Sequence, residues 1–521
     1  MPARQLPARP DLEQLKHQAK DLLRAARGGE ADALARFRIL PAFSARKTAE
    51  LESAPIALHD AQSVIAREHG FDSWNTLRDR VEELTLEFGA AVNSFIEAAT
   101  GERGDRAARL LALHPEIARA NFHTALLVGD AAAVERALAD RPQLATEAGG
   151  QRNWLPLLYI CHNALGDTAA NHDGAVAIAR RLLALGADPN ERFPWLHHGV
   201  RRPALWGAVM ATQSLPLATA LLEAGADASD GVTLPLAAGS GNIAALDLLF
   251  TRGADPNHPW ATDGGAPLYE ILHWAHGLEG AYWLLDHGAS PDPVFPANGE
   301  TPLHVVAAQW DARLAQALVT RGADASRPRA DGRTPFAVAE LSGNREVADW
   351  LRGHGADTAI ADVDRLVAAC SRGDRATAEA MLTARPELRG TIAAEHYDAF
   401  YRAIERNDTR AIDAMLACGF DPNRPDDSIG KTALHAAAME GWPDAARLLL
   451  ERGASVSIRD REFHAQPLIW AAEGSRTSRE GRDHAAVARL LIEAGSPLEW
   501  TTGEEPAEAI LDIVNAWKQV G

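Results

Sequence analysis

Thr301-Pro302-Leu303-His304-Val305-Val306-Ala307-Ala308 opens a segment that ends in Leu318-Val319-Thr320-Arg321-Gly322-Ala323-Asp324. Threonine is a favourable helix N-cap, and proline suits the first helical position, where a missing N–H costs nothing. The apolar residues of the opening then share one helical face. Gly322 suits the left-handed residue that ends a second helix, and Asp324 begins a turn. The segment therefore predicts a pair of short helices followed by a turn.

The ending of this segment recurs along the chain with a spacing near 33 residues. Nine copies keep the glycine, and three weaker copies replace it with a short X-Pro-X-apolar phrase. A single helix pair cannot bury its own apolar face, so the copies must stack on one another. The glycine anchors are Gly186, Gly225, Gly253, Gly288, Gly322, Gly355, Gly419, Gly453 and Gly495, and the weaker copies begin at His114, Arg141 and Arg385.

A period near 33 residues, together with this sequence pattern, resembles the ankyrin repeat. The resemblance covers the chain from about residue 90 onward. It implies an all-α ankyrin-repeat solenoid over residues 90–521, with about twelve helix–turn–helix units joined by hairpin-like loops and a closing helix over about Glu508 to Trp517. It also implies a binding function, in which a concave groove of loops and first helices recognises another protein.

Residues 1–88 predict a separate helical cap. Asp11 can cap a first helix that stops at Gly28-Gly29, and the last helix is expected from Ser73 to Phe88, closed by Gly89. The sequences of residues 15–23 and 70–74 resemble the leader of some bacterial ankyrin-repeat proteins. Since the terminal units of a solenoid need a polar outer face, the cap is expected to cover the first repeat.

Composition narrows the class of partner. The three cysteines are widely spaced, and no apolar run approaches the length of a membrane helix, so we expect a cytoplasmic protein without a membrane contact.

The chain has 52 Lys and Arg residues and 71 Asp and Glu residues, so its net charge is 52 − 71 = −19. That charge opposes sequence-independent binding to nucleic acid, which needs clustered cations. It indicates either a solvated acidic surface or an acidic face for a basic partner.

Local signatures of cofactor and metal sites are weak. Gly239-Ser240-Gly241-Asn242-Ile243-Ala244 fits a dinucleotide-type pattern, but it follows no predicted strand and suits the turn within a helix pair. No cofactor is expected. His197-His198 and His273-x-x-His276 are a possible zinc set, yet no cysteine stands near them, and no metal is predicted.

The middle repeats depart most from the pattern. His304 and His435 occupy a position where the imidazole ordinarily ties neighbouring repeats together, whereas Trp206 and Tyr269 fill that position in the middle repeats. Seven of the 13 tryptophans lie between Trp154 and Trp310, and the longest insertions fall there too. The predicted partner- or ligand-binding residues are Trp195, His197, His198, Arg201, Arg202, Trp206, Trp260, Asp263, Tyr269, His273 and Trp274.

Two functions stay open for these residues. The first is recognition of a partner protein, with Trp206 and Tyr269 on one concave wall and Trp195 near Trp260. The second is a metal-independent enzyme, or a binding protein for a small-molecule ligand, with a pocket in residues 154–310. His197, His198, His273 or Asp263 would then transfer protons, although no residue is assigned as catalytic. The rings could also simply pack the irregular insertions.

Overall fold

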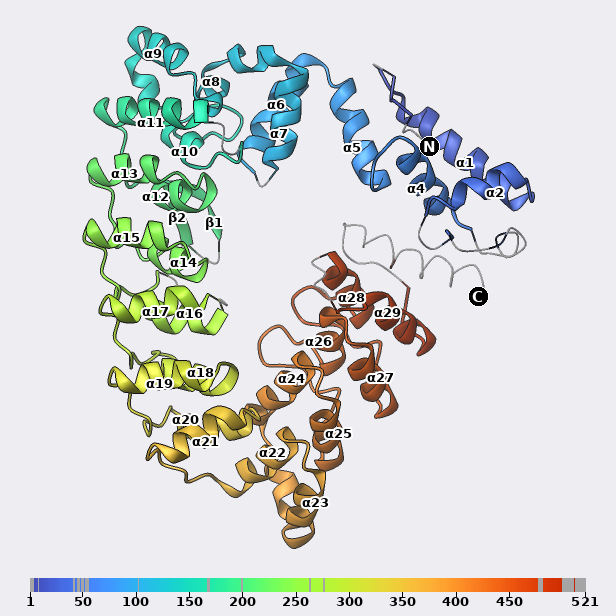
Figure 1. Cartoon of the computed structure of the whole chain (residues 1–521), viewed down its shortest axis with the longest axis vertical. Helices are drawn as coiled ribbons and strands as arrows, with labels where there is room; N and C mark the ends of the chain where they lie inside the picture. The colour runs from blue at the N-terminus through green and yellow to red at the C-terminus, as the bar shows by residue number, and fades with distance from the viewer. Residues whose placement is uncertain are drawn as a thin grey trace. The chain divides into compact units, whose positions relative to one another are not determined.

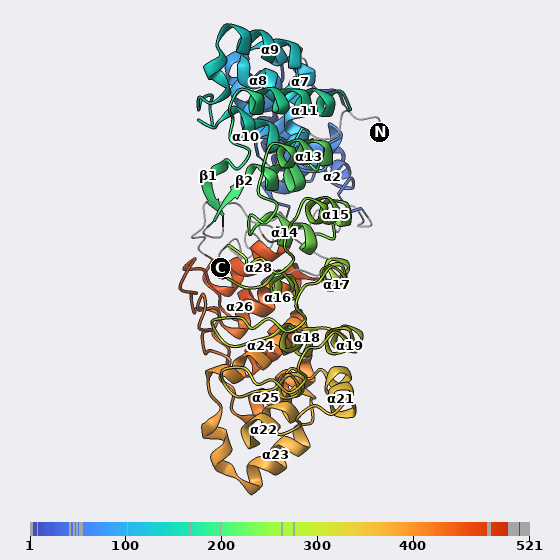
Figure 2. The ribbon, with the colours of Figure 1, turned by 90° about the vertical axis from the view of Figure 1, so that its left-hand side faces the viewer.

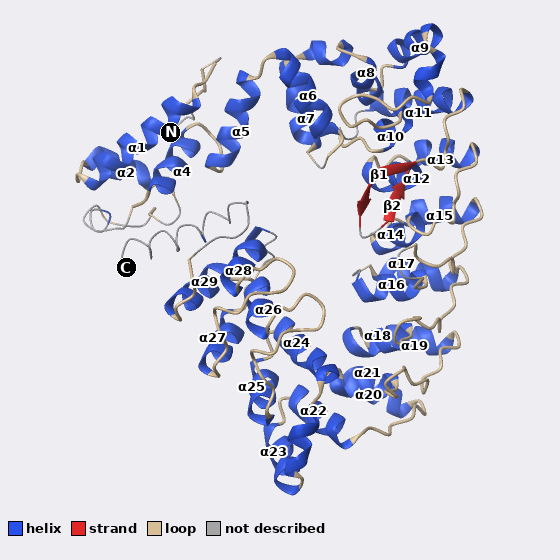
Figure 3. Ribbon diagram, turned by 180° about the vertical axis from the view of Figure 1, so that it is seen from behind, coloured by secondary structure: helices blue, strands red, loops and turns tan. Residues whose placement is uncertain are grey.

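The computed structural model describes residues 4–7, 9–40, 43, 44, 47, 51, 56–101, 103–165, 169–197, 200–261, 264–274, 277–476, 481–498 and 510. Within these residues the chain is mostly helical (Figure 3), and the one sheet is a two-stranded hairpin. No described helix has the length and apolar character needed to cross a bilayer. The predicted closing helix over Glu508 to Trp517 lies outside the described residues, apart from Ile510.

The chain forms two compact units, which we name by their residues. The terminal unit comprises residues 1–81, 307–309 and 333–521, and the middle unit comprises residues 82–306 and 310–332.

The first helices pack around an apolar core of their own. As predicted, the carboxylate of Asp11 accepts hydrogen bonds at the start of α1, and this helix ends before Gly28. The predicted end of the last helix at Gly89 is wrong, because α6 already begins at Phe88 and its apolar stripe is buried in the next helix pair. The elements are α1 (Leu12–Arg27), α2 (Ala31–Phe37), α4 (Leu58–Glu68) and α5 (Trp74–Thr85).

The middle unit is a stack of helix pairs (Figure 1), in which the second helices α13, α15, α17 and α19 follow one another along one side. Its elements are α6 (Phe88–Ala99), α7 (Gly104–Leu113), η1 (Pro115–Arg119), α8 (Phe122–Val128), α9 (Ala131–Asp140), η2 (Pro142–Ala145), α10 (Pro156–Cys161), α11 (Ala169–Ala184), β1 (Arg192–His197), β2 (Val200–Pro203), α12 (Ala204–Trp206), η3 (Gly207–Ala211), α13 (Leu215–Glu223), α14 (Thr233–Gly239), α15 (Ile243–Thr251), α16 (Pro267–Trp274), α17 (Leu278–Asp286), α18 (Pro302–Gln309) and α19 (Ala312–Thr320).

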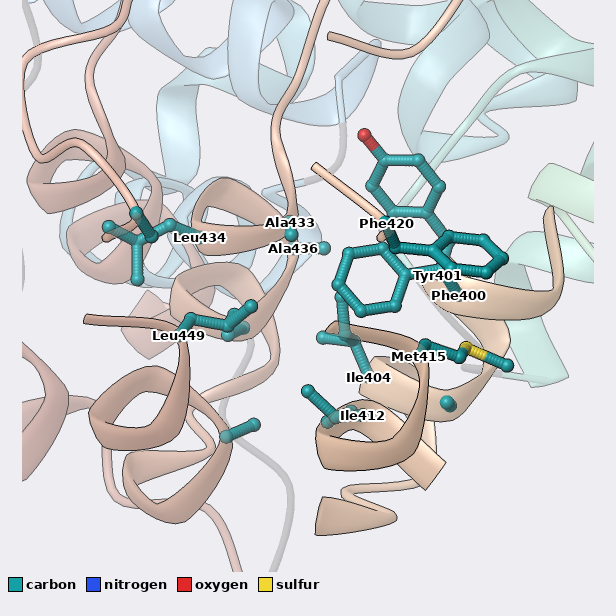
Figure 4. Close-up of a cluster of buried hydrophobic side chains, with 14 of the residues drawn as sticks. Phe400, Tyr401, Ile404, Ile412, Met415, Phe420, Ala433, Leu434, Ala436 and Leu449 are labelled. Carbon is teal, nitrogen blue, oxygen red and sulfur yellow. The ribbon is translucent and has the colours of Figure 1, made fainter. Parts of the chain in front are cut away.

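The terminal unit continues the same pattern beyond residue 333. Phe400, Ile412 and Phe420 from one helix pair form a buried cluster with Leu434 and Leu449 of the next (Figure 4). Its elements are α20 (Pro335–Leu341), α21 (Arg345–Gly353), α22 (Asp362–Ser371), α23 (Arg375–Ala384), η4 (Pro386–Thr391), η5 (Ala394–His396), α24 (Tyr397–Glu405), α25 (Thr409–Cys418), α26 (Ala433–Glu440), α27 (Pro443–Glu451), α28 (Pro467–Arg476) and α29 (His484–Glu493).

The repeat anchors have the backbone that the sequence predicts. All nine anchor glycines have positive φ angles, from 82° at Gly355 to 111° at Gly419. This left-handed conformation is accessible to glycine at little cost and lets the chain turn away from the second helix. The three weaker copies form short 3₁₀ turns instead, each beginning at a proline, as expected for turns that replace the hairpin-like loop, or finger, between two repeats.

Candidate functional site

The insertion before Pro203 forms the β1–β2 hairpin, which stands beside the first helices of the middle unit (Figure 2). Its strands pair Arg192 with Pro203 and Leu196 with Arg201, with an irregularity between these two pairs. Phe193 on β1 is fully buried. The side chains of residues 195–197 are not described, so the hairpin is described by its backbone and by the residues nearer its base.

An aromatic cluster lies under the base of this hairpin. The ring centroid of Phe193 is 5.1 Å from those of Trp154 and His162, and His162 is 5.5 Å from Trp206. Trp206 is only 6% exposed. The guanidinium of Arg202 lies over its ring, with the carbon 4.0 Å from the centroid. Trp206 therefore supports the hairpin from below.

His162 is neutral in this setting. Burial, and to a smaller extent the positive charges of Arg202 and Arg152, lower its pKa to about 4. A neutral imidazole suits the aromatic cluster, because a buried charge without a partner would be costly.

Arg192 at the base of the hairpin binds backbone oxygens. Arg192 donates hydrogen bonds to the carbonyl oxygens of Arg201 and Asp230, at 2.9 and 3.4 Å. Neither Arg192 nor Arg201 makes an ion pair within the described residues. In later fingers of the same unit, by contrast, Arg327 and Arg329 are both ion-paired with carboxylates.

Two repeats further on, an aromatic pair reaches the surface. Trp274, the last residue of α16, is 42% exposed, and its ring meets the half-buried Trp260 edge to face at 5.6 Å. Tyr269 is only 3% exposed, and its hydroxyl donates to Glu300 at 3.0 Å. His273 is exposed and stacks on Tyr269 at 5.8 Å.

Hydrogen bonds to backbone carbonyl groups join these features across three repeats. The guanidinium of Arg192 contacts the carbonyl of Asp230, and the next residue, Gly231, accepts from the N–H of Ala261 at 3.0 Å. Ala261 directly follows Trp260. We define the finger surface as the solvent-facing residues along this connected path: Arg192, Arg201, Arg202, Trp260, His273 and Trp274.

The structure corrects one geometric prediction. Trp206 and Tyr269 do not line an open wall, because both rings are buried, one in the aromatic cluster and the other against Phe295 and Glu300. The physical reason is that a large ring gains more by packing under its own finger than by facing water. Among the predicted aromatic residues whose side chains are described, Trp274 is instead the exposed one.

Several predicted site residues lie outside what the structure describes. His198, Asp263 and His276 are not described, and the side chains of Trp195 and His197 are not described either. The expected proximity of Trp195 to Trp260 and the zinc alternative are therefore untested. Within the described residues, no group of three or more His, Cys, Asp or Glu side chains is arranged to hold a metal ion.

Sequence reasoning missed Arg192, Phe193 and His162. A count within residues 191–203 would have found the first, since that stretch holds three arginines and one acidic residue in an acidic chain. No sequence signal marks His162, which merely follows the buried run of α10. Its role comes from contacts made by distant segments.

Comparison with known proteins identifies the repeat. An ankyrin-repeat family model matches residues 270–362, 366–460 and 400–499. The chain contains ankyrin repeats. Human ARF GTPase-activating protein GIT1 is 40% identical over 99 residues, a match that covers 18% of this chain and 13% of that protein. Human ankyrin repeat and SOCS box protein 6 is 38% identical over 76 residues, covering 15% of this chain and 18% of that protein.

Among solved structures, the ankyrin repeat domain of Bcl-3, described as a unique member of the IkappaB protein family, matches with 26% identity and a TM-score of 0.36. The match covers 44% of this chain and 97% of that domain. The chain thus spans only a small part of the curated relatives above. Those relatives are human, so the bacterial origin suggested by the leader stays a prediction.

Ankyrin repeats in general serve protein–protein interaction, and the matched repeats therefore do not favour the enzyme alternative. Of its four proton-transfer candidates, only His273 has a described side chain. That ring is exposed and stacked on Tyr269, whereas acid–base catalysis would place it in an enclosed pocket.

Proposed function

We propose that this protein binds a partner protein through the finger surface of its middle repeats. The observation that carries the proposal is Trp274, an exposed indole that contacts Trp260 and is connected through hydrogen bonds between fingers to Arg192 of the hairpin. Tryptophan and arginine are the residues that most often dominate binding energy at protein interfaces. The buried Trp206 and Tyr269 hold this surface from beneath.

Rigidity supports the same proposal. Hydrogen bonds to backbone carbonyl groups join neighbouring fingers, so the exposed side chains stand on a preformed scaffold. A preformed surface loses less conformational entropy on binding than a loop that must first become ordered. The segments shared with the relatives are short parts of those proteins. We therefore transfer only binding through ankyrin repeats to this chain. GTPase activation and the other activities belong to the whole relatives and are not part of the proposal.

We also propose that residues 1–88 act as a cap for the repeats of residues 90–521. The first helices have an apolar core of their own, which suits a module that folds at the end of an array. Full-length and truncated chains can be compared by hydrogen exchange. Loss of protection in residues 90–150 on deleting 1–88 supports a cap, and unchanged protection indicates an independent module.

The binding proposal is tested with a matched pair of exposed aromatic residues. Trp274 and Phe463 are 42% and 54% exposed, and they lie in fingers or first helices of different repeats. Affinity purification with the wild-type chain identifies partners, and titration with the purified partner measures Kd. We expect Trp274→Ala to weaken binding by about 2 kcal/mol or more, with Phe463→Ala silent.

Circular dichroism checks that both variants fold. The opposite result, loss of binding in Phe463→Ala with Trp274→Ala silent, moves the interface to the C-terminal repeats and overturns the proposal. Equal losses in both variants point to a partner that spans the array, and they also contradict a site confined to the middle repeats.

A further inference from the structure

A row of aromatic rings runs from one finger to the next at the end of α16. The Trp260 ring meets Trp274 edge to face at 5.6 Å. The residue before Trp274, His273, stacks on Tyr269 at 5.8 Å, and Tyr269 stacks on Phe295 of the next finger at 4.6 Å. We call these five residues the aromatic row. Its rings form one packed set that links two fingers.

The solvent-facing side of the aromatic row is apolar. Trp274 is 42% exposed, and Val294, the residue before Phe295, is 49% exposed. Pro296 and Ala297, which follow Phe295, are exposed as well. The backbone N–H of Phe295 closes this finger by donating to the carbonyl of Glu300 at 2.7 Å. The apolar side chains therefore stand on an ordered turn.

The charged side chains beside the row are already bound. Among the described residues of the fingers 256–266 and 290–300, the only Asp, Glu, Lys or Arg residues are Asp292 and Glu300. Asp292 pairs with Arg327 at 2.8 Å, and Glu300 pairs with Arg329 at 2.6 Å. Since both carboxylates have their own cations, a charged ligand gains little here, and the surface favours an uncharged one.

The two tryptophans of the row also keep their indole N–H groups. In the same unit, the indole of Trp283 donates to Asp247 at 2.8 Å and that of Trp310 to a backbone carbonyl at 2.9 Å. The indoles of Trp260 and Trp274 contact each other, and within the described residues neither donates to an acceptor. The row thus offers apolar surface together with two hydrogen-bond donors.

We propose that the aromatic row binds an extended, proline-containing segment of the partner protein. The proline ring packs on an indole, and backbone carbonyls of the segment accept from the indole N–H groups. Proline has no N–H of its own that would be left unpaired against an apolar surface.

The polyproline II conformation suits the same surface. Such a segment has no internal hydrogen bonds, so its carbonyls are available, and it loses little conformational entropy on binding. Aromatic-lined surfaces are a recurring way to recognise it. This inference rests on the proposed function and adds the chemistry of the partner.

The test uses the full chain and a random peptide display library as the probe. We expect the selected peptides to be enriched in prolines separated by two residues. Changing these prolines to alanine in a selected peptide should weaken its binding by about tenfold or more. Raising the salt concentration from about 50 to about 500 mM should change the affinity less than about twofold, because no ion pair forms.

Two variants of Trp274 separate its ring from its donor. Trp274→Ala should weaken binding of the selected peptides by about thirtyfold or more. Trp274→Phe keeps a ring but lacks the indole N–H, and it should weaken binding by about fivefold. Phe463→Ala, at an exposed ring of another repeat, is the control and should leave peptide affinity unchanged. Circular dichroism checks that all three variants fold.

Selected peptides that depend on Trp274 but lack proline, or that bind as well after their prolines are changed, show that the proline-containing partner is wrong and that the binding site stands. A strong salt dependence overturns the inference in the same way, because it indicates a charged segment. Full affinity in Trp274→Phe contradicts the hydrogen bond from the indole. If Trp274→Ala binds the peptides like the wild type, or if no peptide is enriched, the proposed function fails as well.

Discussion

Single residues in this protein show how the position of a histidine decides what its ring contacts. The Nδ1 of His435 accepts from the N–H of Thr432 at 3.0 Å, so the proton lies on Nε2, which donates to the carbonyl of Ala465 at 3.1 Å. Ala465 belongs to the next repeat, which confirms that this histidine ties neighbouring repeats together. His304 accepts from Thr301 in the same way. His162, in contrast, is held by aromatic rings.

His162 predicts a loss of stability in acid. Its pKa is about 4 in the folded chain against 6.5 when unfolded, so only the unfolded state takes up a proton between these values. Its contribution is complete above pH 6.5 and is lost as the pH falls toward 4. Between pH 7 and pH 5 the free energy of unfolding should drop by about 2 kcal/mol on this account.

Urea unfolding of the wild type and of His162→Phe at both pH values measures this effect. The phenylalanine keeps a ring in the cluster but cannot take up a proton, so the variant should lose about 2 kcal/mol less than the wild type on going to pH 5. Equal losses in the two proteins would show that His162 does not couple to folding.

At the scale of elements, the helix that carries Trp206 is unusual. After the short α12 the backbone widens into the π-helix η3, where the N–H of Thr212 reaches back five residues to the carbonyl of Gly207. A π-helix takes up an extra residue within a helix and is frequent at functional sites. Gly207 also lets this helix approach α10, since a Cβ there would lie 2.7 Å from the carbonyl oxygen of Cys161.

Because the backbone at Gly207 lies so close to α10, replacing glycine by alanine should have opposite effects on stability at Gly207 and at Gly353. Gly207→Ala should lower the free energy of unfolding by about 1–3 kcal/mol, because the new methyl group must push α12 and α10 apart. Gly353→Ala should raise it by up to about 1 kcal/mol, because Gly353 ends α21 with no atom within 4 Å of the added Cβ and alanine favours helix. Thermal unfolding of both variants compares the two, and a loss at Gly353 equal to that at Gly207 would rule out the contact as the cause.

At the scale of the whole molecule, a recurring asparagine after the anchor glycine bonds one repeat to the next. Asn257 donates to the carbonyl of Gly288 at 3.0 Å and accepts from the N–H of Ser290 at 2.7 Å. Asn190 and Asn423 make the same two bonds to their following repeats. Because each repeat is stabilised mainly by its neighbours, these bridges couple folding along the array.

Removing one bridge should therefore have a local effect. Asn257→Ala loses two hydrogen bonds between the repeats anchored at Gly253 and Gly288, and we expect a loss of about 1 kcal/mol. Hydrogen exchange should show weaker protection in residues 278–309, with residues 433–451 unchanged as an internal control. A uniform loss along the chain would mean that the array unfolds as one cooperative unit.

The sequence by itself determined the repeat, the glycine turns and the bridging role of His435. These features follow from rules that act within a few residues: positive φ needs glycine, and a Thr-Pro pair begins a helix. The position of the predicted site in the middle repeats was a sequence inference too, drawn from the tryptophans and insertions.

Only the tertiary structure decided which of those residues face solvent. Trp206 and Tyr269 are buried by residues from other segments, and Arg201 is left without an ion pair because no described carboxylate of a neighbouring finger reaches it. The thiol of Cys370 in α22 likewise donates to the carbonyl of Ala414 in α25 at 3.8 Å, a contact between residues 44 apart in the sequence. Burial and pairing depend on the stacking of separate repeats, and residue spacing along the chain does not encode which side chains that stacking brings together.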